Sequence, residues 1–522
     1  MDIEKWLLIF SLGSTILAIL SLFYYKKRFD QCKNYSLQRH SGSFQQLVRV
    51  AGNVCQEHRN LLNVKDRSVQ VPIMISHRTD EEILLNPMLG TGKKNDVGSG
   101  RSFMPETLFY KLGGYVIADS AFPKHYVDEG SILFLKGSPR KEILINPNDV
   151  KAAIVTCGGL CPGLNVVIRE LVMTLWYNYG VKHISGIIGG YPGFYTQGCL
   201  KTLTPSIVAD IHLSGGTILK TSRGGWNLEK IMDSIIKNGF NQVYIIGGDG
   251  THRGIKNLVD EIERKHLPIY VVGIPKTIDN DIPIIDKSFG FDTAVEEAQK
   301  AIESANTEAN SVEYGIGLVK LMGRNSGFIA MQASNANRNV NLCLIPESGY
   351  ELTGPNGVYS YISERLKVKK HAVIVVAEGA AASCLDEKLA AEGTDPSGNP
   401  ILYDIGKHLK EELVKCCKKH NINATLKYID PTYMIRTVPA NSSDKILCSE
   451  LAQAAVHGTF AGFTGFSVGN VTGQAVFIPI DLLISIKEGK DAKEGQRRVD
   501  IDENMMWWRL MANTGQPSFI ND

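Results

Sequence analysis

Short, nearly continuous apolar runs alternate with helical patterns from residue 151 onward, and this alternation most strongly constrains the fold. Apolar side chains at successive positions are typical of strands that are covered on both faces, as in parallel sheets. The alternation with helices predicts an α/β fold in which mainly parallel, doubly wound sheets form two lobes. The predicted strands are 152–157, 242–248, 268–274, 340–346 and 371–379. The predicted helices are 165–178, 227–238, 252–265, 292–309 and 356–369.

The composition excludes several classes of protein. The chain of 522 residues is 43% hydrophobic and 21% charged, with a formal net charge of +2. These values are globular, so a collagen, a coiled coil and a disordered chain are excluded, and no basic excess indicates nucleic-acid binding. The 10 cysteines form no CxxC pair and no regular framework, which favours a reduced intracellular compartment over disulfides or structural zinc.

An uncharged apolar stretch at 6–25 is followed directly by Lys26, Lys27 and Arg28. A helix of this length spans about 30 Å, the hydrocarbon thickness of a bilayer, and basic residues favour the cytosolic side. The sequence therefore predicts a membrane anchor within residues 1–30 that faces the cytosol. A cleaved secretory signal and a buried amphipathic element are the alternatives. Residues 31–150 are expected to form an extension without a catalytic signature.

Glycines gather at the carboxyl ends of two predicted strands, which is where open α/β sheets bind their ligands. CGGLCPGLN (157–165) follows the first strand, and GGDGT (247–251) overlaps the end of the second. Backbone N–H groups in such turns can approach phosphate oxygens, and an Asp between the glycines can hold Mg²⁺. For the first cluster, a tight turn without a ligand is an equal alternative. GGDGT indicates phosphate without defining the substrate, because NAD kinases and lipid kinases also contain it.

A third polar cluster, PKTIDND (275–281), follows the predicted strand 268–274. Its carboxylates Asp279 and Asp281 lie beside Lys276 and Thr277, so they can divide the work of a general base and a metal-linked orienting group. An exposed polar loop is the alternative, but it explains poorly why so many such groups follow one strand.

Nine motifs in a fixed order resemble those of the 6-phosphofructokinase family, over roughly residues 100–520. The form most resembled is the plant-type ATP-dependent enzyme, which is related to pyrophosphate-dependent members. The resemblance implies two lobes. The nucleotide-binding lobe would comprise residues 151–291 together with about 435–485, and the sugar-phosphate lobe would comprise residues 292–434 together with 486–522. The motifs are CGGLCPGLN, TSRGG (221–225), GGDGT, PKTIDND, GFDTA (290–294), VKLMGRNSGF (319–328), PES (346–348), AEG (377–379) and DPTYMIR (430–436).

The resemblance also implies a role for each matched residue. Asp279 would be the general base for the sugar 1-hydroxyl, with Thr277, Asp281 and Arg223 as catalytic partners, and Asp249 would bind Mg²⁺. Tyr433 and Arg436 would approach the 6-phosphate from a neighbouring subunit, as in the family. The residues implied for ATP are Gly159, Ser222, Arg223, Gly248, Asp249, Gly250 and Thr251. The residues implied for fructose 6-phosphate are Thr277, Ile278, Asp279, Met322, Gly323, Arg324, Glu378, Tyr433, Met434, Ile435 and Arg436.

Gly250 and Lys276 bear on the phosphoryl donor. Pyrophosphate-using relatives typically have an aspartate at the position of Gly250, which would occupy the space of a nucleotide α-phosphate and repel it. Gly250 therefore favours ATP, whereas Lys276 resembles the pyrophosphate-dependent pattern; plant-type ATP enzymes share this Gly–Lys combination. The chain departs from bacterial members at Leu160, Gly315, Lys427 and Tyr433, which bear on the sugar-phosphate contacts and not on the chemical core.

The expected function is that of an ATP- and Mg²⁺-dependent 6-phosphofructokinase, which makes fructose 1,6-bisphosphate in the committed step of glycolysis. The resemblance implies a homotetramer with allosteric regulation. The apolar stretch at 6–25 and its basic flank predict membrane association with the catalytic region in the cytoplasm. Two alternatives remain: a pyrophosphate-dependent enzyme, and a non-catalytic regulatory subunit on the same fold. A lipid or NAD kinase would leave PKTIDND and MGR unexplained.

Overall fold

The computed structural model describes residues 84–85, 115–117, 133–383, 393, 401–485 and 496–519. These residues belong to one compact unit, Asn60–Asp522; a second unit, Met1–Arg59, lies outside them. The expected membrane anchor at 6–25 therefore falls outside the described residues. Within the described ranges, no helix combines the length and the apolar character that a membrane span requires.

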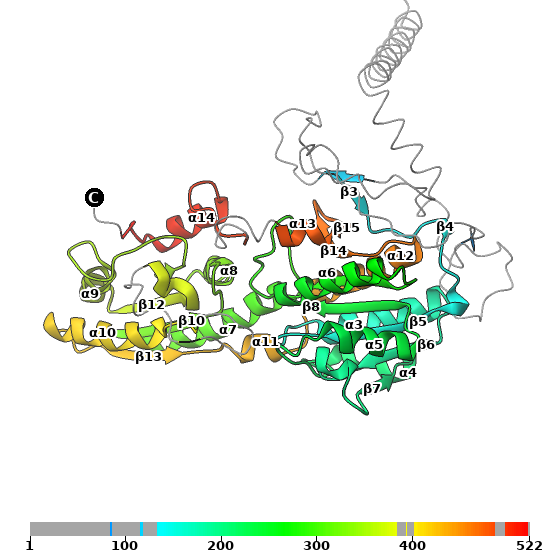
Figure 1. Ribbon diagram of the computed structural model, residues 1–522. Coiled ribbons are helices and arrows are strands. Elements are labelled where there is room, and N and C mark those ends of the chain that lie inside the picture. Colours follow the sequence, from blue (N-terminus) through cyan, green and yellow to red (C-terminus); the bar gives the residue numbers. More distant parts are fainter. Residues whose placement is uncertain are drawn as a thin grey trace, which may run out of the picture. The chain divides into compact units, whose positions relative to one another are not determined.

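A nine-stranded sheet contains the first three predicted strands as neighbours (Figure 1). β14, β9, β8, β5 and β6 run parallel, while β2, β3, β15 and β7 pair antiparallel at the two edges. The segment 31–150 thus contributes β2 and β3 to this sheet. In spatial order the strands are β2 (Tyr115–Ile117), β3 (Leu133–Lys136), β15 (Gln474–Pro479), β14 (Phe466–Val471), β9 (Tyr270–Pro275), β8 (Gln242–Gly247), β5 (Lys151–Thr156), β6 (His183–Ile187) and β7 (Leu200–Thr202).

A second sheet of four parallel strands holds the other two predicted strands (Figure 1). Its order is β11 (Leu342–Leu344), β12 (His371–Ala377), β10 (Gly315–Leu321) and β13 (Thr425–Ile429). A separate two-stranded sheet pairs β1 (Leu84–Leu85) with β4 (Glu142–Ile143). The α/β class and the mainly parallel sheets are therefore confirmed.

The helices match the sequence pattern closely, with one difference that matters for the site. The helix expected at 252–265 begins at Asp249, so the GGDGT aspartate lies in its first turn. The helix expected at 165–178 ends its α-helical part at Met173 and continues as a π-helical turn, Thr174–Asn178. The α-helices of the described ranges are α3 (Leu164–Met173), α4 (Pro205–Val208), α5 (Leu228–Asn238), α6 (Asp249–Arg264), α7 (Phe291–Asn310), α8 (Phe328–Ala336), α9 (Val358–Lys369), α10 (Ile405–Lys419), α11 (Met434–Thr437), α12 (Ser442–Phe460), α13 (Ile480–Ser485) and α14 (Met505–Thr514).

Alternate side chains of the central strands enter different apolar layers. On β5, Ile154 belongs to the layer that α3 and α12 cover, whereas Val155 belongs to the layer under α5 and α6. On β10, Leu318 and Val319 divide in the same way between two layers. Burial on both faces explains why these strands read as continuous apolar runs. Buried residues of α7 join the layer that is shared by both sheets, so this helix connects the two halves of the fold.

Candidate active site

Three polar loops follow neighbouring strands of the larger sheet. Thr156 at the end of β5 pairs with Ile246 of β8, and Gly247 at the end of β8 pairs with Pro275 of β9. Parallel strands of matched length bring their carboxyl ends to one edge, so the loops that begin at 157, 247 and 276 lie side by side. The three sequence clusters therefore belong to one site.

The first loop folds back on the TSRGG segment. Gly158 has a φ of +85°, and its N–H donates to the carbonyl of Ser222 at 2.9 Å. A Cβ placed on Gly159 would lie 3.6 Å from Nη2 of Arg223 and 3.8 Å from Nη1 of Arg436. Two guanidinium groups thus flank a backbone without a side chain, an arrangement that suits a phosphate group. Arg436 reaches this loop within its own chain.

Ser222 carries a buried hydroxyl at the same loop. Its Oγ has no hydrogen-bond partner among the described residues. A Cβ on Gly190 would lie 2.5 Å from this Oγ, so the glycine is needed for the close approach. A buried hydroxyl without a partner is costly, and a ligand oxygen would satisfy it.

The second loop becomes the first turn of α6. Gly248 is the N-cap residue of this helix, so its first N–H groups and the helix dipole favour an anion there. The imidazole of His252 lies 3.0 Å from the carbonyl of Gly248 and 3.0 Å from Oγ of Ser467, which ties the turn to β14. Gly250 is exposed, and a Cβ there would meet no atom within 4 Å.

Lys276 lies beneath the first two loops. Its side chain is only 7% exposed, and its N–H donates to the carbonyl of Gly247 at 2.9 Å. A Cβ on Gly158 would lie 3.5 Å from its Nζ. Burial lowers the pKa of Lys276, and the positive charges of Arg223 and Arg436 lower it further, against the opposing effect of two nearby thiols. Three cationic groups therefore face one small region, which is a strong indication of a polyanionic ligand.

The carboxylate of Asp279 is the least compensated polar group of the third loop. Its Oδ1 is buried and has no hydrogen-bond partner within the described part of the chain. Burial raises the pKa of Asp279 well above its usual value, and the negative charges of Asp281 and Glu378 raise it further, against Arg324 and Lys276. A carboxyl group with a raised pKa and a free oxygen suits a general base.

Thr277 organises the two carboxylates. Its hydroxyl donates to Oδ1 of Asp281 at 3.0 Å and accepts from the N–H of Asp279 at 3.2 Å. The side chain of Asp281 is thereby oriented separately from that of Asp279. Two carboxylates with different partners can take different roles in one reaction.

The smaller sheet contributes the opposite side of the site. Gly323 follows β10 and Gly379 follows β12, and the N–H of Gly379 donates to the carbonyl of Gly323 at 3.1 Å. A Cβ on Gly379 would lie 1.7 Å from the carbonyl oxygen of Arg324, so only glycine fits. Burial raises the pKa of Glu378, while the charges of Arg324 and Lys320 lower it. Because Arg324 and Glu378 both act on Asp279, the two sheets meet at this carboxylate.

The remaining predicted residues differ in their exposure. Tyr433 and Met434 are 70% and 69% exposed, and the guanidinium of Arg436 lies 4.9 Å from the centre of the Tyr433 ring. Ile278 and Ile435 are buried in the core, so any contact of these two with a substrate would come from main-chain atoms. Met322 also packs against the core. Lys427 pairs with Glu308 at 3.5 Å.

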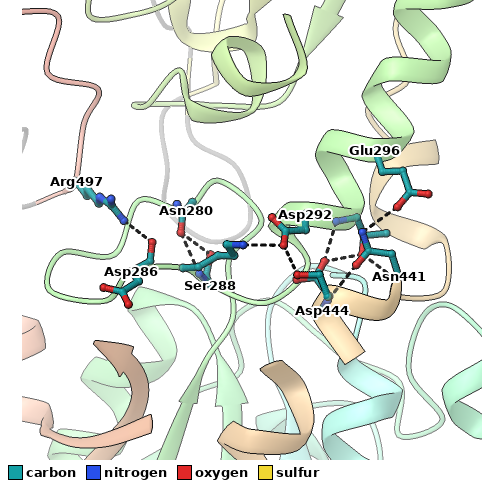
Figure 2. Close-up of polar contacts among 11 residues, drawn as sticks. Asn280, Asp286, Ser288, Asp292, Glu296, Asn441, Asp444 and Arg497 are labelled. Atoms are coloured by element: carbon teal, nitrogen blue, oxygen red, sulfur yellow. Dashed lines mark hydrogen bonds and ion pairs between the residues drawn. The ribbon is translucent and has the colours of Figure 1, made fainter. Parts of the chain in front are cut away.

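Two residues, Asn280 of the PKTIDND motif and Arg497, have supporting roles that the sequence analysis did not predict. Asn280 has a φ of +56°, and its Oδ1 accepts from the N–H of Ser288 at 2.9 Å, which closes the loop after PKTIDND (Figure 2). Figure 2 also shows Arg497 reaching Asp286, whose carbonyl accepts from its Nη1 at 2.8 Å. The N–H of Arg497 donates to the carbonyl of Asp281 at 2.9 Å. Arg497 lies in no recognisable motif, so no signal in one sequence could have assigned it to the site.

Comparison with known proteins places the chain in a family. Residues 151–459 match the phosphofructokinase family model. The chain is 51% identical over 410 residues to "ATP-dependent 6-phosphofructokinase 7" of Arabidopsis thaliana, covering 78% of this chain and 82% of the relative. It is 54% identical over 389 residues to "ATP-dependent 6-phosphofructokinase 1" of the same plant, covering 74% and 80%. The chain therefore belongs to the phosphofructokinase family.

Solved structures with the same fold are more distant in sequence. The pyrophosphate-dependent phosphofructokinase from Marinobacter aquaeolei superposes with a TM-score of 0.56 at 15% identity, covering 72% of this chain and 92% of that chain. The Pichia pastoris phosphofructokinase superposes with a TM-score of 0.55 at 20% identity. The matched region covers 70% of this chain and 38% of the Pichia chain. These two likenesses bear on the fold alone.

Proposed function

We propose that this protein transfers the γ-phosphoryl group of ATP to O-1 of fructose 6-phosphate, making fructose 1,6-bisphosphate in glycolysis. The observation that carries the proposal is the Asp279 carboxylate, whose buried Oδ1 has no hydrogen-bond partner among the described residues and which lies where the phosphate loops meet Arg324 and Glu378. The names of the Arabidopsis relatives, at about half identity, support ATP and fructose 6-phosphate as the substrates.

In the proposed reaction, Asp279 takes the proton from the 1-hydroxyl as its oxygen attacks the γ-phosphorus in line with the leaving ADP oxygen. Arg223 stabilises the charge that spreads over the equatorial oxygens of the transferred group. Thr277 keeps Asp281 oriented during this step, and the Gly248–Thr251 turn binds the nucleotide phosphates. On the sugar side, Arg324 and Glu378 bind the substrate, and Arg436 neutralises a phosphate.

Mg²⁺ is part of the proposal. The partly buried carboxylates of Asp249 and Asp281 offer the hard oxygen ligands that this ion prefers, and substrate phosphates usually supply further ligands. When bound, Mg²⁺ would neutralise charge on the phosphate oxygens. Chelation of the ion should abolish turnover, and added Mg²⁺ should restore it.

Gly250 supports ATP over pyrophosphate as the donor. A Cβ at this position meets no protein atom within 4 Å, so the space beside the helix N-terminus is free for a nucleotide. A pyrophosphate-dependent enzyme is the second candidate, because Lys276 resembles that pattern and lies buried among the phosphate loops. A regulatory subunit without activity is disfavoured by the intact Asp279, Asp281 and Arg223.

The proposal extends to the organisation of the chain. A nucleotide-binding lobe would comprise 151–291 with about 435–485, and a sugar-phosphate lobe would comprise 292–434 with 486–522. We expect a homotetramer, tested by light scattering of the purified protein. Residues 6–25 would tether the enzyme to a membrane with its catalytic part in the cytosol. A reporter fused to residues 1–30 should resist carbonate extraction, and recovery in the soluble fraction would exclude the tether.

The test uses the purified protein with fructose 6-phosphate, Mg²⁺ and either ATP or pyrophosphate, with fructose 1,6-bisphosphate as the measured product. Turnover with ATP alone is the expected result. Turnover with pyrophosphate would reverse the donor assignment and give Lys276 the greater weight. A folded protein that is inactive with both donors would favour the regulatory subunit.

A further inference from the structure

Lys320 carries a pair of ionic contacts that none of the roles above explains. It lies on β10, shortly before Met322, Gly323 and Arg324, and its side chain is only 13% exposed. Its Nζ lies 2.8 Å from Oδ2 of Asp430 and 3.2 Å from Oδ1 of Asp404. A lysine so well covered and held by two carboxylates is a fixed contact, unlike an exposed surface pair.

The two carboxylates are themselves fixed by other groups. Oδ1 of Asp404 caps α10 by accepting from the N–H of Lys407 at 3.2 Å, and it also accepts from the hydroxyl of Tyr428 at 3.5 Å. Oδ1 of Asp430 accepts from both the N–H and the hydroxyl of Thr432. Lys320 therefore connects the start of α10 to the turn that follows β13.

The turn beginning at Asp430 leads directly into Tyr433–Arg436, the segment that the sequence resemblance assigns to fructose 6-phosphate. Val319 of β10 pairs with Ile429 of β13, so the MGR segment and the Asp430 turn leave neighbouring strands at the same edge. Arg436, at the far end of the turn, reaches Gly159 in the first phosphate loop. A displacement of Asp430 would thus move the group that neutralises the phosphate.

The charges support a permanent link. Partial burial opposes ionisation of Asp430, but hydrogen bonds from Lys320 and Thr432 outweigh it and lower its pKa. Burial likewise opposes the charge of Lys320, yet the hydrogen bond and the charges of its acidic partners raise its pKa. Both groups therefore stay charged through the physiological pH range. The ion pair is thus a permanent contact that does not respond to pH in this range.

We propose that Lys320 is a positioning residue that acts through Asp430 to hold the Tyr433–Arg436 segment in place for fructose 6-phosphate. The assignment rests on the proposed function, because it gives that segment its ligand. Lys320 itself would not contact the substrate and would act on it only through Asp430. Its loss should therefore weaken sugar-phosphate binding more than ATP binding.

The experiment compares steady-state kinetics of the full chain with Lys320→Met, Lys320→Arg, Asp430→Asn and the double variant Lys320→Met/Asp430→Asn. Lys407→Met is the matched control, because Nζ of Lys407 lies 3.3 Å from Oδ2 of the same Asp404, whereas the ion pair with Asp430 is made by Lys320. Lys320→Met should raise KM for fructose 6-phosphate about tenfold or more, since it leaves Asp430 partly buried without its cationic partner. KM for ATP should change less, because Lys276 and Arg223 still face the phosphate loops when Arg436 is displaced.

Further outcomes separate positioning from simple stabilisation. Lys320→Arg should recover most of the affinity, Lys407→Met should match wild type, and the double variant should be no worse than Lys320→Met because the two changes break one link. An unchanged KM for fructose 6-phosphate in Lys320→Met would overturn the proposal. So would a parallel rise in both KM values that follows a fall in melting temperature. Absence of turnover in the wild-type enzyme would instead overturn the proposed function, and this assignment with it.

Discussion

At the scale of single residues, the site contains charged or polar groups that are buried without full compensation by hydrogen bonds or opposite charges. Asp279 has a raised pKa, Lys276 a lowered one, and Ser222 a buried hydroxyl without a partner among the described residues. Each conflict costs folding free energy, and a phosphate ligand or a substrate hydroxyl would relieve it. The cost is thus a signature of function and not of stability.

Replacing Asp279 by Asn should separate catalysis from folding. The amide cannot accept the proton of the 1-hydroxyl, so kcat should fall by at least about 10²-fold, the lower range for loss of a general base. The melting temperature should stay equal or rise, because burial penalises the carboxylate that is removed. Both are measured on the same purified variant, by coupled assay and by calorimetry. Near wild-type turnover would remove Asp279 from this role.

Gly250 provides a direct test of the donor assignment. Gly250→Asp should fold normally, since its Cβ meets no neighbour and an acidic residue suits the first turn of α6. KM for ATP should rise about tenfold or more through repulsion of the nucleotide phosphates. Gly250→Ala is the control, because it adds the methyl group without the charge and should retain ATP use. If both variants bind ATP as the wild type does, the argument from Gly250 fails.

At the scale of the elements, strand ends position the chemistry while connecting segments hold it rigid. β8 and β9 end together, which places GGDGT beside PKTIDND. The segment around Arg497 then fastens the loop after PKTIDND: its Nη1 donates to the carbonyls of Ile285 and Asp286 at 3.0 and 2.8 Å. Its guanidinium also lies 5.2 Å from the centre of the Phe328 ring at the start of α8.

Arg497→Met should therefore loosen the loop without touching the catalytic groups. Two carbonyls lose their donor, so the free energy of unfolding should fall by about 1–3 kcal/mol. The Mg²⁺ concentration for half-maximal turnover should rise, because Asp281 lies at the start of the same loop. Arg264→Met is the control: the Arg264 side chain is 68% exposed in its ion pair with Glu261, so the pair should contribute little. Equal Mg²⁺ dependence in all three proteins would show that the loop needs no such fastening.

At the scale of the whole molecule, α12 packs against α3, and a buried polar contact joins α12 to the segment that follows α3. His457 of α12 is only 3% exposed, and its Nδ1 lies 2.8 Å from the hydroxyl of Tyr179. Burial lowers the pKa of His457 to about 3, and the positive charge of Arg140 contributes. The neutral imidazole is thus the form that the fold accepts.

This histidine predicts a loss of stability in mild acid. Its pKa is about 6.5 in the unfolded chain and about 3 in the folded protein, so its contribution is complete above pH 6.5 and declines as the pH falls toward 3. Between pH 7 and pH 5 the loss should be about 2 kcal/mol. Urea unfolding at both values should show a smaller loss in His457→Gln than in the wild type. The same loss in both proteins would contradict the prediction.

The periodicity of the chain by itself determined the fold class, because strands buried on both faces must be continuously apolar. It did so at β5, β8, β9, β11 and β12. Among the parallel strands it missed β6, β10, β13 and β14. In β10 and β13, Gly315, Gly317, Lys320 and Lys427 interrupt the apolar pattern. In β10, packing against α7 determines the residue type: a Cβ on Gly317 would lie 2.5 Å from the carbonyl oxygen of Ala305, so only glycine fits there.

The motifs likewise determined which residues carry the chemistry, since phosphate loops need glycines and carboxylates at strand ends. Only the tertiary structure decided how these groups act on one another. Arg436 and Gly159 are far apart in sequence and meet because α11 returns to the end of β5. The pKa of Asp279 is raised first by burial and then by the charges of Asp281 and of Glu378, which follows β12 of the other sheet. Burial and Coulomb interaction depend on distance in space, which one-dimensional spacing does not contain.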